Sequence, residues 1–298
     1  MSEPRRTVDV VVVSYNSRDR LRACVEPLVG LDDVHVIVAD NASPDASLEA
    51  VSDLELTAIQ LPRNGGFAYG VNAGWRAGHA THVLLLNPDA HIDREALHTL
   101  VAAIEEDESV GAVGPRIVHT DGTLDWSQRR YPRLRSTYAR ALFLHRLFPD
   151  APWTDELVRD EGAYARRNRP DWLSGACLLV RREALERLDG LDEGFFMYAE
   201  DIDLCRRLRD AGYELLYEPA AVVEHEGGAS APRAALLPTL AESRIRYAVK
   251  HRGRLAAALE RVGIGLEALT HVIVSRGGMA VRKGHAGALR AVARSVQT

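Results

Sequence analysis

Two groups of carboxylates in this sequence have residue types and spacing suited to chemistry on a phosphorylated substrate. Asn87-Pro88-Asp89 directly follows the apolar run 82–86, and Glu200, Asp201 and Asp203 lie within four residues of one another. A carboxylate at the end of a buried strand can hold a hard divalent cation, which takes oxygen ligands and often shares them with phosphates. Asn-Pro-Asp is also an ordinary turn sequence, so this motif alone indicates either a turn or a metal ligand.

The acids at 200–203 open a predicted amphipathic helix, 199–211, that ends at Gly212. Acids near a helix N-terminus are favoured by capping and by the helix dipole. Three carboxylates after an aromatic run nevertheless exceed what capping needs, and one of them could remove a proton from an attacking hydroxyl. Asp203 has a simpler interpretation as the partner of Arg206 or Arg207 along the helix.

His225 ends the last apolar run and precedes Gly227-Gly228. A neutral imidazole at this position could complete a cation site begun by Asp89. The alternative is a surface histidine at the end of a strand.

Alternating strands and helices must position these residues. We predict strands at 8–13, 34–39, 57–61 and 82–86, and helices at 18–29, 47–53 and 68–77. This alternation indicates a mainly parallel sheet with helices on both faces, in which ligands bind beyond the carboxyl ends of the strands. Each polar motif so far falls at such an end: Ser14-Tyr15-Asn16, Asp40-Asn41, Asn64-Gly65-Gly66 and Asn87-Pro88-Asp89.

The second half of the chain is less regular. Residues 121–170 are rich in Arg, Pro and aromatic residues without a clear period, which predicts an irregular excursion that could act as a mobile flap. Strands are predicted at 172–180, 213–218 and 221–225. From residue 236 the chain is predicted to be helical, with breaks near Gly253, Gly263, Gly277-Gly278 and Gly284.

Composition limits the class of protein. With 298 residues, 46% apolar and 27% charged, the chain can form one large globular domain plus an appendage. No run is apolar and long enough to span a bilayer, and Arg5-Arg6 is followed by too short an apolar run for a signal peptide, so we expect a cytoplasmic location. Cys24, Cys177 and Cys205 form neither a disulfide framework nor a zinc pattern.

Charge is distributed unevenly along the chain. Residues 231–298 contain twelve Lys or Arg and three Glu, whereas the remainder has a net charge of −14. A basic C-terminal segment could meet a phosphate-rich surface, or its charges could solvate helices and pair with the acidic body.

The motifs, taken in order, resemble the inverting glycosyltransferases of family 2, which have the GT-A nucleotide-sugar-binding fold, and among them the bacterial rhamnosyltransferases of cell-wall and O-antigen assembly. The resemblance covers roughly residues 8–230 and rests on 12–16, 38–43, 64–72, 86–90, 172–176, 196–204 and His225. It implies a GT-A domain at 1–235 and a basic helical extension at 236–298.

The resemblance also implies roles for individual residues. The nucleotide-sugar donor would be held by Ser14, Tyr15, Asn16, Asp40, Asn64, Gly65, Gly66, Asn72 and Asn87. Asp40 would accept a hydrogen bond from a pyrimidine imide. Asp89 corresponds to the last acid of the family's metal-binding Asp-x-Asp, with Asn87 in place of the first acid, and His225 to a histidine that binds Mn²⁺ or Mg²⁺ in some members.

On the acceptor side, Asp201 corresponds to the general base and Glu200 would orient Asp201 or the acceptor. Trp172 and Gly175 match the acceptor-side loop. The chain lacks the Gln-x-x-Arg-Trp motif and the membrane helices of processive members, which predicts transfer of one sugar followed by release. The basic extension could contact anionic lipid at the inner face of the membrane or the diphosphate of the acceptor.

The sequence therefore predicts transfer of a single sugar, L-rhamnose from dTDP-rhamnose, to a glycan or a polyprenyl-diphosphate-linked saccharide. Alternatives are another nucleotide sugar with a small-molecule or protein acceptor, or a non-catalytic carbohydrate-binding protein. Two other enzyme classes are disfavoured. A nucleotidyltransferase would open with a glycine-rich loop, whereas this chain opens with Ser14-Tyr15-Asn16 after its first strand. A dinucleotide oxidoreductase would carry Gly-x-Gly-x-x-Gly after that strand, and this sequence does not. No nucleic-acid partner is expected, and homodimer formation is left open.

Overall fold

The computed structural model describes residues 7–227, 233–274 and 278–294, which form two compact units. Unit 1 comprises Met1–Gln128, Asp160–Gly194 and Glu200–Ser230. Unit 2 comprises Arg129–Arg159, Phe195–Ala199 and Ala231–Thr298. The division into domains at 1–235 and 236–298 stays a prediction.

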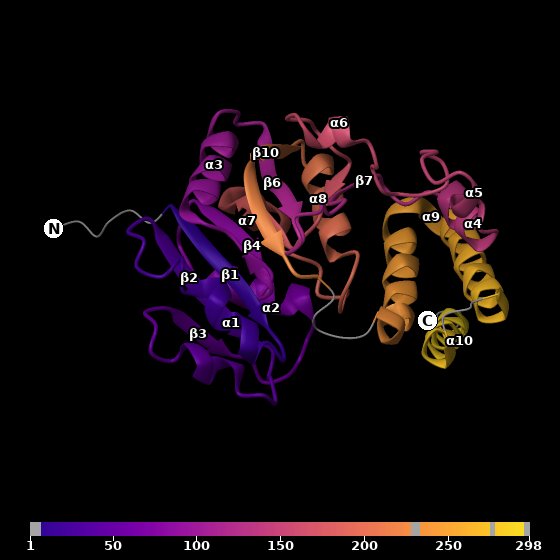
Figure 1. The fold of residues 1–298 in the computed structure, drawn as a ribbon, viewed down its shortest axis with the longest axis horizontal. Helices are drawn as coiled ribbons and strands as arrows, with labels where there is room; N and C mark the ends of the chain where they lie inside the picture. The colour runs from indigo at the N-terminus through magenta and orange to yellow at the C-terminus, as the bar shows by residue number, and fades with distance from the viewer. Residues whose placement is uncertain (1–6, 228–232, 275–277, 295–298) are drawn as a thin grey trace. The chain divides into compact units, whose positions relative to one another are not determined.

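An eight-stranded sheet forms the centre of unit 1 (Figure 1), in the order β3-β2-β1-β4-β9-β6-β10-β5. Its strands are β1 (Val8–Ser14), β2 (Val34–Asp40), β3 (Thr57–Gln60), β4 (His82–Leu86), β5 (Ala90–His91), β6 (Val110–Val118), β9 (Cys177–Arg181) and β10 (Glu214–His225). β1 is parallel to β2 and β4, β2 to β3, and β6 to β10. β9 runs antiparallel to β4 and β6, and β5 runs antiparallel to β10. The expected α/β fold is confirmed, with a mixed sheet.

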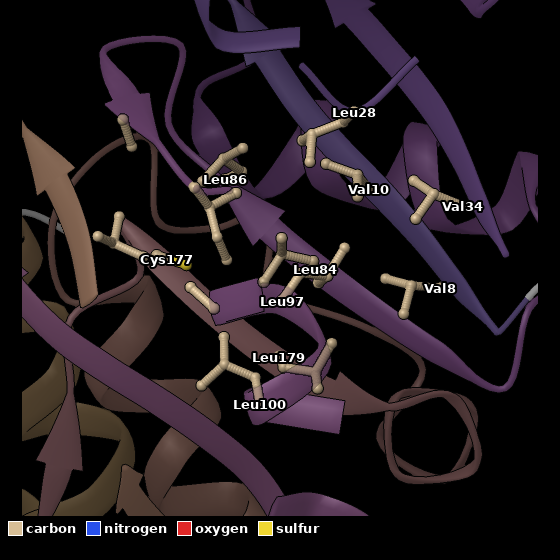
Figure 2. Packing of buried hydrophobic residues seen from close by; sticks show 14 of the residues in the cluster. Val8, Val10, Leu28, Val34, Leu84, Leu86, Leu97, Leu100, Cys177 and Leu179 are labelled. Atoms are coloured by element: carbon tan, nitrogen blue, oxygen red, sulfur yellow. The ribbon is translucent and has the colours of Figure 1, made fainter. Parts of the chain in front are cut away.

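Helices cover both faces of this sheet. They are α1 (Arg18–Val25), the 3₁₀ helix η1 (Ser47–Val51), α2 (Phe67–Ala77), α3 (Arg94–Glu105), α6 (Glu161–Tyr164), α7 (Arg182–Leu188) and α8 (Glu200–Asp210). On one face, Val10 of β1 and Leu84 of β4 pack in the core with Leu28, which follows α1, and with Leu97 of α3 (Figure 2). The other face of β1 is covered by α2, and burial on both faces explains why this strand is apolar from Val10 to Val13.

Two predicted strands differ from the structure. The segment 172–180 is divided into β8 (Trp172–Leu173) and β9, because residues 174–176 form a loop between them. The separate strands at 213–218 and 221–225 are one strand, β10, with a register shift between Glu218 and Val222. The patterns also gave no indication of α3, β6 and α7.

Unit 2 is mainly helical. It contains α4 (Leu134–Ala141), α5 (Leu144–Leu147), α9 (Arg233–Val274) and α10 (Gly278–Arg294), and Arg129 ends the short strand β7 (Gln128–Arg129). The segment 121–170, expected to be irregular, thus includes the short helices α4, α5 and α6. Among the described helices, none combines the length and the hydropathy that a bilayer-spanning segment needs.

The predicted helix breaks are confirmed only in part. Gly253 has φ 76° and interrupts α9, as expected. Gly263 and Gly284 instead lie inside helices, where the lack of a side chain permits a close approach. A Cβ on Gly263 would lie 2.8 Å from Cγ2 of Thr137. Gly278 begins α10, and both Gly277 and Gly228 lie outside the described residues. The three cysteines are free and buried.

Candidate active site

The topology brings the predicted motifs to one edge of the sheet in unit 1. β1, β2, β3 and β4 are parallel, so their carboxyl ends share an edge (Figure 1). β9 is antiparallel to β4 and therefore begins there, which places the loop 174–176 beside Asn87: the Asn87 amide donates to the Ala176 carbonyl at 2.9 Å. β6 runs antiparallel to β9, and β10 runs parallel to β6. β10 therefore ends at the same edge, with His225 as its last residue.

Asp40 links the end of β2 to the end of β3. Its buried carboxylate accepts hydrogen bonds from the Ser43 amide (2.9 Å), the Ser43 hydroxyl (2.5 Å) and Nε2 of Gln60 (2.8 Å). The Asn16 amide donates to Oγ of the same Ser43 at 3.2 Å. Beside it, Ser14 is buried and Tyr15 is 39% exposed. The carboxylate is therefore fixed in place at the end of β2, and Tyr15, directly after β1, has an accessible ring that a nucleobase could stack on.

The glycine-rich turn before α2 is shaped by two asparagines. Nδ2 of Asn41 donates to the Gly66 carbonyl, and Oδ1 of Asn64 accepts from the Gly66 amide, both at 3.0 Å. Gly66 has φ 90°, a conformation that favours glycine. A side chain on Gly65 would overlap the ring of Tyr69. The backbone of this turn therefore has a fixed shape at the edge of the sheet where the predicted motifs meet.

Asn72, which the resemblance placed among the donor-binding residues, is buried and bonded within the protein. Its Nδ2 donates to the Leu191 carbonyl (2.8 Å) and to Oε1 of Glu193 (2.9 Å). Its Oδ1 accepts from the Leu191 amide (2.9 Å) and from Nε1 of Trp75 (3.1 Å). These four bonds saturate a carboxamide. Asn72 thus fastens α2 to residues 191–193 and has no hydrogen-bonding group left for a ligand.

Asp89 and His225, predicted as metal ligands, lie side by side. Oδ1 of Asp89 is 3.2 Å from Nε2 of His225, and Nδ2 of Asn87 is 3.3 Å from the same nitrogen. The Glu226 amide donates to the Asp89 carbonyl at 3.1 Å. The three side chains that the sequence assigned to the metal side of the site therefore meet around one imidazole nitrogen.

The electrostatics of this cluster favour charged groups. Burial would raise the pKa of Asp89, but the hydrogen bond and charge of His225 outweigh it, so that pKa is lowered. Burial would lower the pKa of His225, yet the carboxylates of Asp125 and Asp89 raise it to about 9. Oδ2 of Asp125 lies 4.0 Å from Nδ1, a distance for charge attraction rather than a hydrogen bond. Sequence reasoning missed Asp125, which lies in a segment without any period.

The donor set fits a cation that the protein shares with its substrate. Among the described residues, no three His, Cys, Asp or Glu side chains form a metal-binding group. Asp89 would supply one carboxylate oxygen, and His225 one imidazole nitrogen once a bound cation displaces the proton that it holds at neutral pH. Mg²⁺ usually keeps several waters and binds through one or two carboxylates together with substrate phosphates. Two protein ligands are therefore compatible with a cation that binds together with a diphosphate.

Asp201 lies at the start of α8 and is half-buried. Its Oδ2 accepts from the Gly175 amide at 3.2 Å and its Oδ1 from the Ile202 amide at 2.8 Å. A Cβ on Gly175 would lie 3.3 Å from Cβ of Asp201 and 3.8 Å from Cε1 of Phe67, so the glycine allows this approach. The loop 174–176 thus bonds to Asp201 through Gly175 and to Asn87 through Ala176, while Trp172 is buried just before it.

The neighbouring acids have different environments. Glu200 is buried, and burial followed by repulsion from Asp201 raises its pKa to about 8, so its neutral form predominates at neutral pH. Asp203 is fully buried and pairs with Nε of Arg207 at 2.7 Å, which confirms its predicted structural role. Of the three carboxylates, Asp201 alone is both half-buried and bonded to the loop 174–176.

Comparisons with known proteins point to one family. Residues 9–188 match glycosyl transferase family 2. N-acetylglucosaminyl-diphospho-decaprenol L-rhamnosyltransferase of Mycobacterium tuberculosis is 33% identical over 239 residues, which cover 75% of this chain and 77% of the relative. Rhamnosyltransferase WbbL of Escherichia coli is 27% identical over 228 residues, which cover 72% of this chain and 81% of the relative.

Solved structures show the same fold. The mannosyltransferase PcManGT from Pyrobaculum calidifontis, in complex with GDP-Man and Mn²⁺, matches with a TM-score of 0.59 and 18% identity, covering 98% of this chain and 87% of that chain. The family match extends over more than half of the sequence, and the mycobacterial relative shares a third of its aligned residues. The chain is therefore a glycosyltransferase and belongs to glycosyl transferase family 2.

Proposed function

We propose that this glycosyltransferase transfers a single L-rhamnosyl residue from dTDP-rhamnose to a hydroxyl of a lipid-linked saccharide or glycan, with inversion at the anomeric carbon. The observation that carries the proposal is the pair of bonds made by the loop 174–176. Ala176 bonds to Asn87 on the metal side, and Gly175 bonds to Asp201 on the acceptor side. This arrangement supports a site in which a diphosphate and an acceptor hydroxyl are held together.

Asp201 serves as the general base in this proposal. Its carboxylate takes the proton of the acceptor hydroxyl while that oxygen forms a bond to the anomeric carbon. The bond from the anomeric carbon to the diphosphate oxygen breaks at the same time, and its electron pair leaves with dTDP. One displacement inverts the configuration. The amides of Gly175 and Ile202 fix the orientation of the carboxylate.

Asp89 and His225 would hold a divalent cation with the donor diphosphate, and Asn87 would contribute its carboxamide. When bound, the cation would neutralise charge on the leaving group. Asp40 would accept a hydrogen bond from the thymine imide, with Tyr15 against the base. Glu200, as a neutral acid, would support the orientation of Asp201, and Trp172 and Gly175 would border the acceptor.

The choice of rhamnose is supported by the names of the two relatives, both of which are rhamnosyltransferases. Another nucleotide sugar with a different acceptor is the alternative within the family. A non-catalytic carbohydrate-binding protein is the alternative outside it. The proximity of Asp89 and His225, and the fixed carboxylate of Asp201, favour a catalyst.

A panel of nucleotide sugars tested by thermal shift with and without Mn²⁺ checks the donor and the metal site. We expect dTDP-rhamnose with Mn²⁺ to raise Tm most, because a ligand at 100 times its Kd adds about 2.7 kcal/mol to the free energy of unfolding. Asp89→Asn should lose most of the metal-dependent part of this shift, whereas Asp121→Asn, in an exposed loop of unit 1, should retain it.

A larger shift with another nucleotide sugar would contradict the assignment of rhamnose. A full Mn²⁺-dependent shift in Asp89→Asn would contradict the metal site. If no sugar nucleotide stabilises the wild-type protein, the donor site itself is wrongly assigned.

A further inference from the structure

The second half of α9, after the interruption at Gly253, exposes an apolar stripe. Leu255, Leu259, Val262, Leu266, Leu269 and Ile273 follow one another at intervals of three or four residues, which places them on one face of the helix. Leu255 is 76% exposed and Ile273 is 68% exposed. By the helical rise, this stripe is about 27 Å long.

Two acids on another face of the same helix are bonded to side chains within unit 2. Glu260 accepts from the Thr137 hydroxyl at 2.5 Å and from Nη2 of the buried Arg244 at 3.1 Å. Glu267 pairs with Nη2 of Arg140 at 2.8 Å. Turning the helix to bury its leucines would remove both acids from their partners, at a cost of several kcal/mol. The ion pairs therefore hold the stripe on the outside of unit 2.

Unit 2 has further exposed apolar side chains. The Thr270 hydroxyl donates to the Ala141 carbonyl at 2.8 Å, which places the exposed Leu142 beside the C-terminal end of the stripe. The rings of Phe148 and Trp153, also exposed, lie 5.9 Å apart. Of fifteen large apolar side chains exposed in the described parts of the chain, thirteen belong to unit 2. We call the six residues of the stripe with Leu142 the apolar face.

The charge of unit 2 is strongly positive. Its segments contain 19 Lys and Arg and 6 Asp and Glu, a net charge of +13, whereas unit 1 has a net charge of −18. Three of the six acids, Glu156, Glu260 and Glu267, are occupied in pairs with Arg244 and Arg140. Unit 2 therefore has a strong excess of positive charge, and the exposed Arg254 directly precedes Leu255 of the stripe.

We propose that the apolar face of unit 2 docks on the surface of an anionic phospholipid bilayer. Its leucines enter the boundary between headgroups and acyl chains, and the Lys and Arg side chains of unit 2 contact lipid phosphates. A second copy of the chain is a poorer occupant, because it would bring two units of net charge +13 together. A nucleic acid would match the charge but would leave the leucines in water. This surface is independent of the proposed reaction.

The test is co-sedimentation of the full-length protein with vesicles. We expect binding to an equal mixture of phosphatidylcholine and phosphatidylglycerol, little binding to phosphatidylcholine alone, and weaker binding in high salt. Leu255→Ser combined with Leu259→Ser should weaken partition at least about tenfold, since two large side chains lose their lipid contact. Val222→Ser, at an exposed valine of β10 in unit 1, is the matched control and should bind like wild type.

Circular dichroism and thermal unfolding check that both variants fold. Wild-type protein that stays in the supernatant with anionic vesicles would overturn the proposal. So would a stripe variant that binds as well as wild type, or a wild-type dimer in light scattering that the stripe substitutions dissociate. Asp201→Asn should bind vesicles normally, so a failure of vesicle binding and a failure of the catalytic assignment remain distinguishable.

Discussion

At the scale of single residues, three carboxylates within four positions differ because their surroundings differ. Asp203 is an ion-pair partner of Arg207, Glu200 is buried beside a like charge, and Asp201 is held by two backbone amides. Their spacing identified the cluster in the sequence, and the helical position of Asp203 predicted its pairing. The difference between Glu200 and Asp201 depends on burial, which sequence spacing does not report.

Glu200→Gln should change how stability depends on pH. Burial raises the folded-state pKa of Glu200 from 4.5 to about 8, so between these values the folded protein retains a proton that the unfolded chain releases. The free energy of unfolding of wild type should therefore fall by a few kcal/mol as pH rises from about 4.5 to about 8. Urea unfolding at both ends of this window should show a smaller fall for Glu200→Gln, while the exposed Glu55→Gln behaves like wild type. Parallel curves for wild type and Glu200→Gln would contradict the neutral acid.

At the scale of elements, apolar runs predicted β1, β2 and β4 because burial on both faces requires them. The run 172–180 was misleading, because Gly175 and Ala176 leave the sheet to bond to Asp201 and Asn87. Those partners lie 26 and 89 residues away in the sequence, and no local pattern reports them. The bond between Asp40 and Ser43 could be predicted, in contrast, because an aspartate that bonds to a residue three positions later in a turn is a local pattern.

Two glycine substitutions test how closely the elements pack. A Cβ on Gly74 would overlap Cγ1 of Val11, so Gly74→Ala should destabilise the protein by about 1–3 kcal/mol through overpacking of α2 on β1. A Cβ on Gly265 would lie 3.5 Å from Cγ1 of Val292, an ordinary contact, so Gly265→Ala should stabilise it by about 0.5–1 kcal/mol through helix propensity. Chemical unfolding measures both, and effects of the same sign would contradict the packing described here.

At the scale of the whole molecule, the order of the motifs predicted both the fold and the edge of the sheet where Asp89 and His225 meet. The excess of basic residues after residue 231 was also visible in the sequence. The sequence did not reveal that residues 129–159 belong to the same unit as the C-terminal helices. One contact between them is the bond from Arg140 to Glu267, which are 127 positions apart. Pairings over such separations depend on tertiary packing, which is also why Asp125 beside His225 was missed.

The transfer rate of Asp201→Asn tests the central claim most directly. With saturating dTDP-rhamnose, Mn²⁺ and a lipid-linked acceptor, we predict a loss of about 10²–10⁴-fold, the usual contribution of a general base, while the thermal shift caused by the donor persists. Asp210→Asn, at the exposed end of the same helix, should transfer at the wild-type rate. Equal transfer rates for Asp201→Asn and wild type would contradict the assignment of Asp201 as the base.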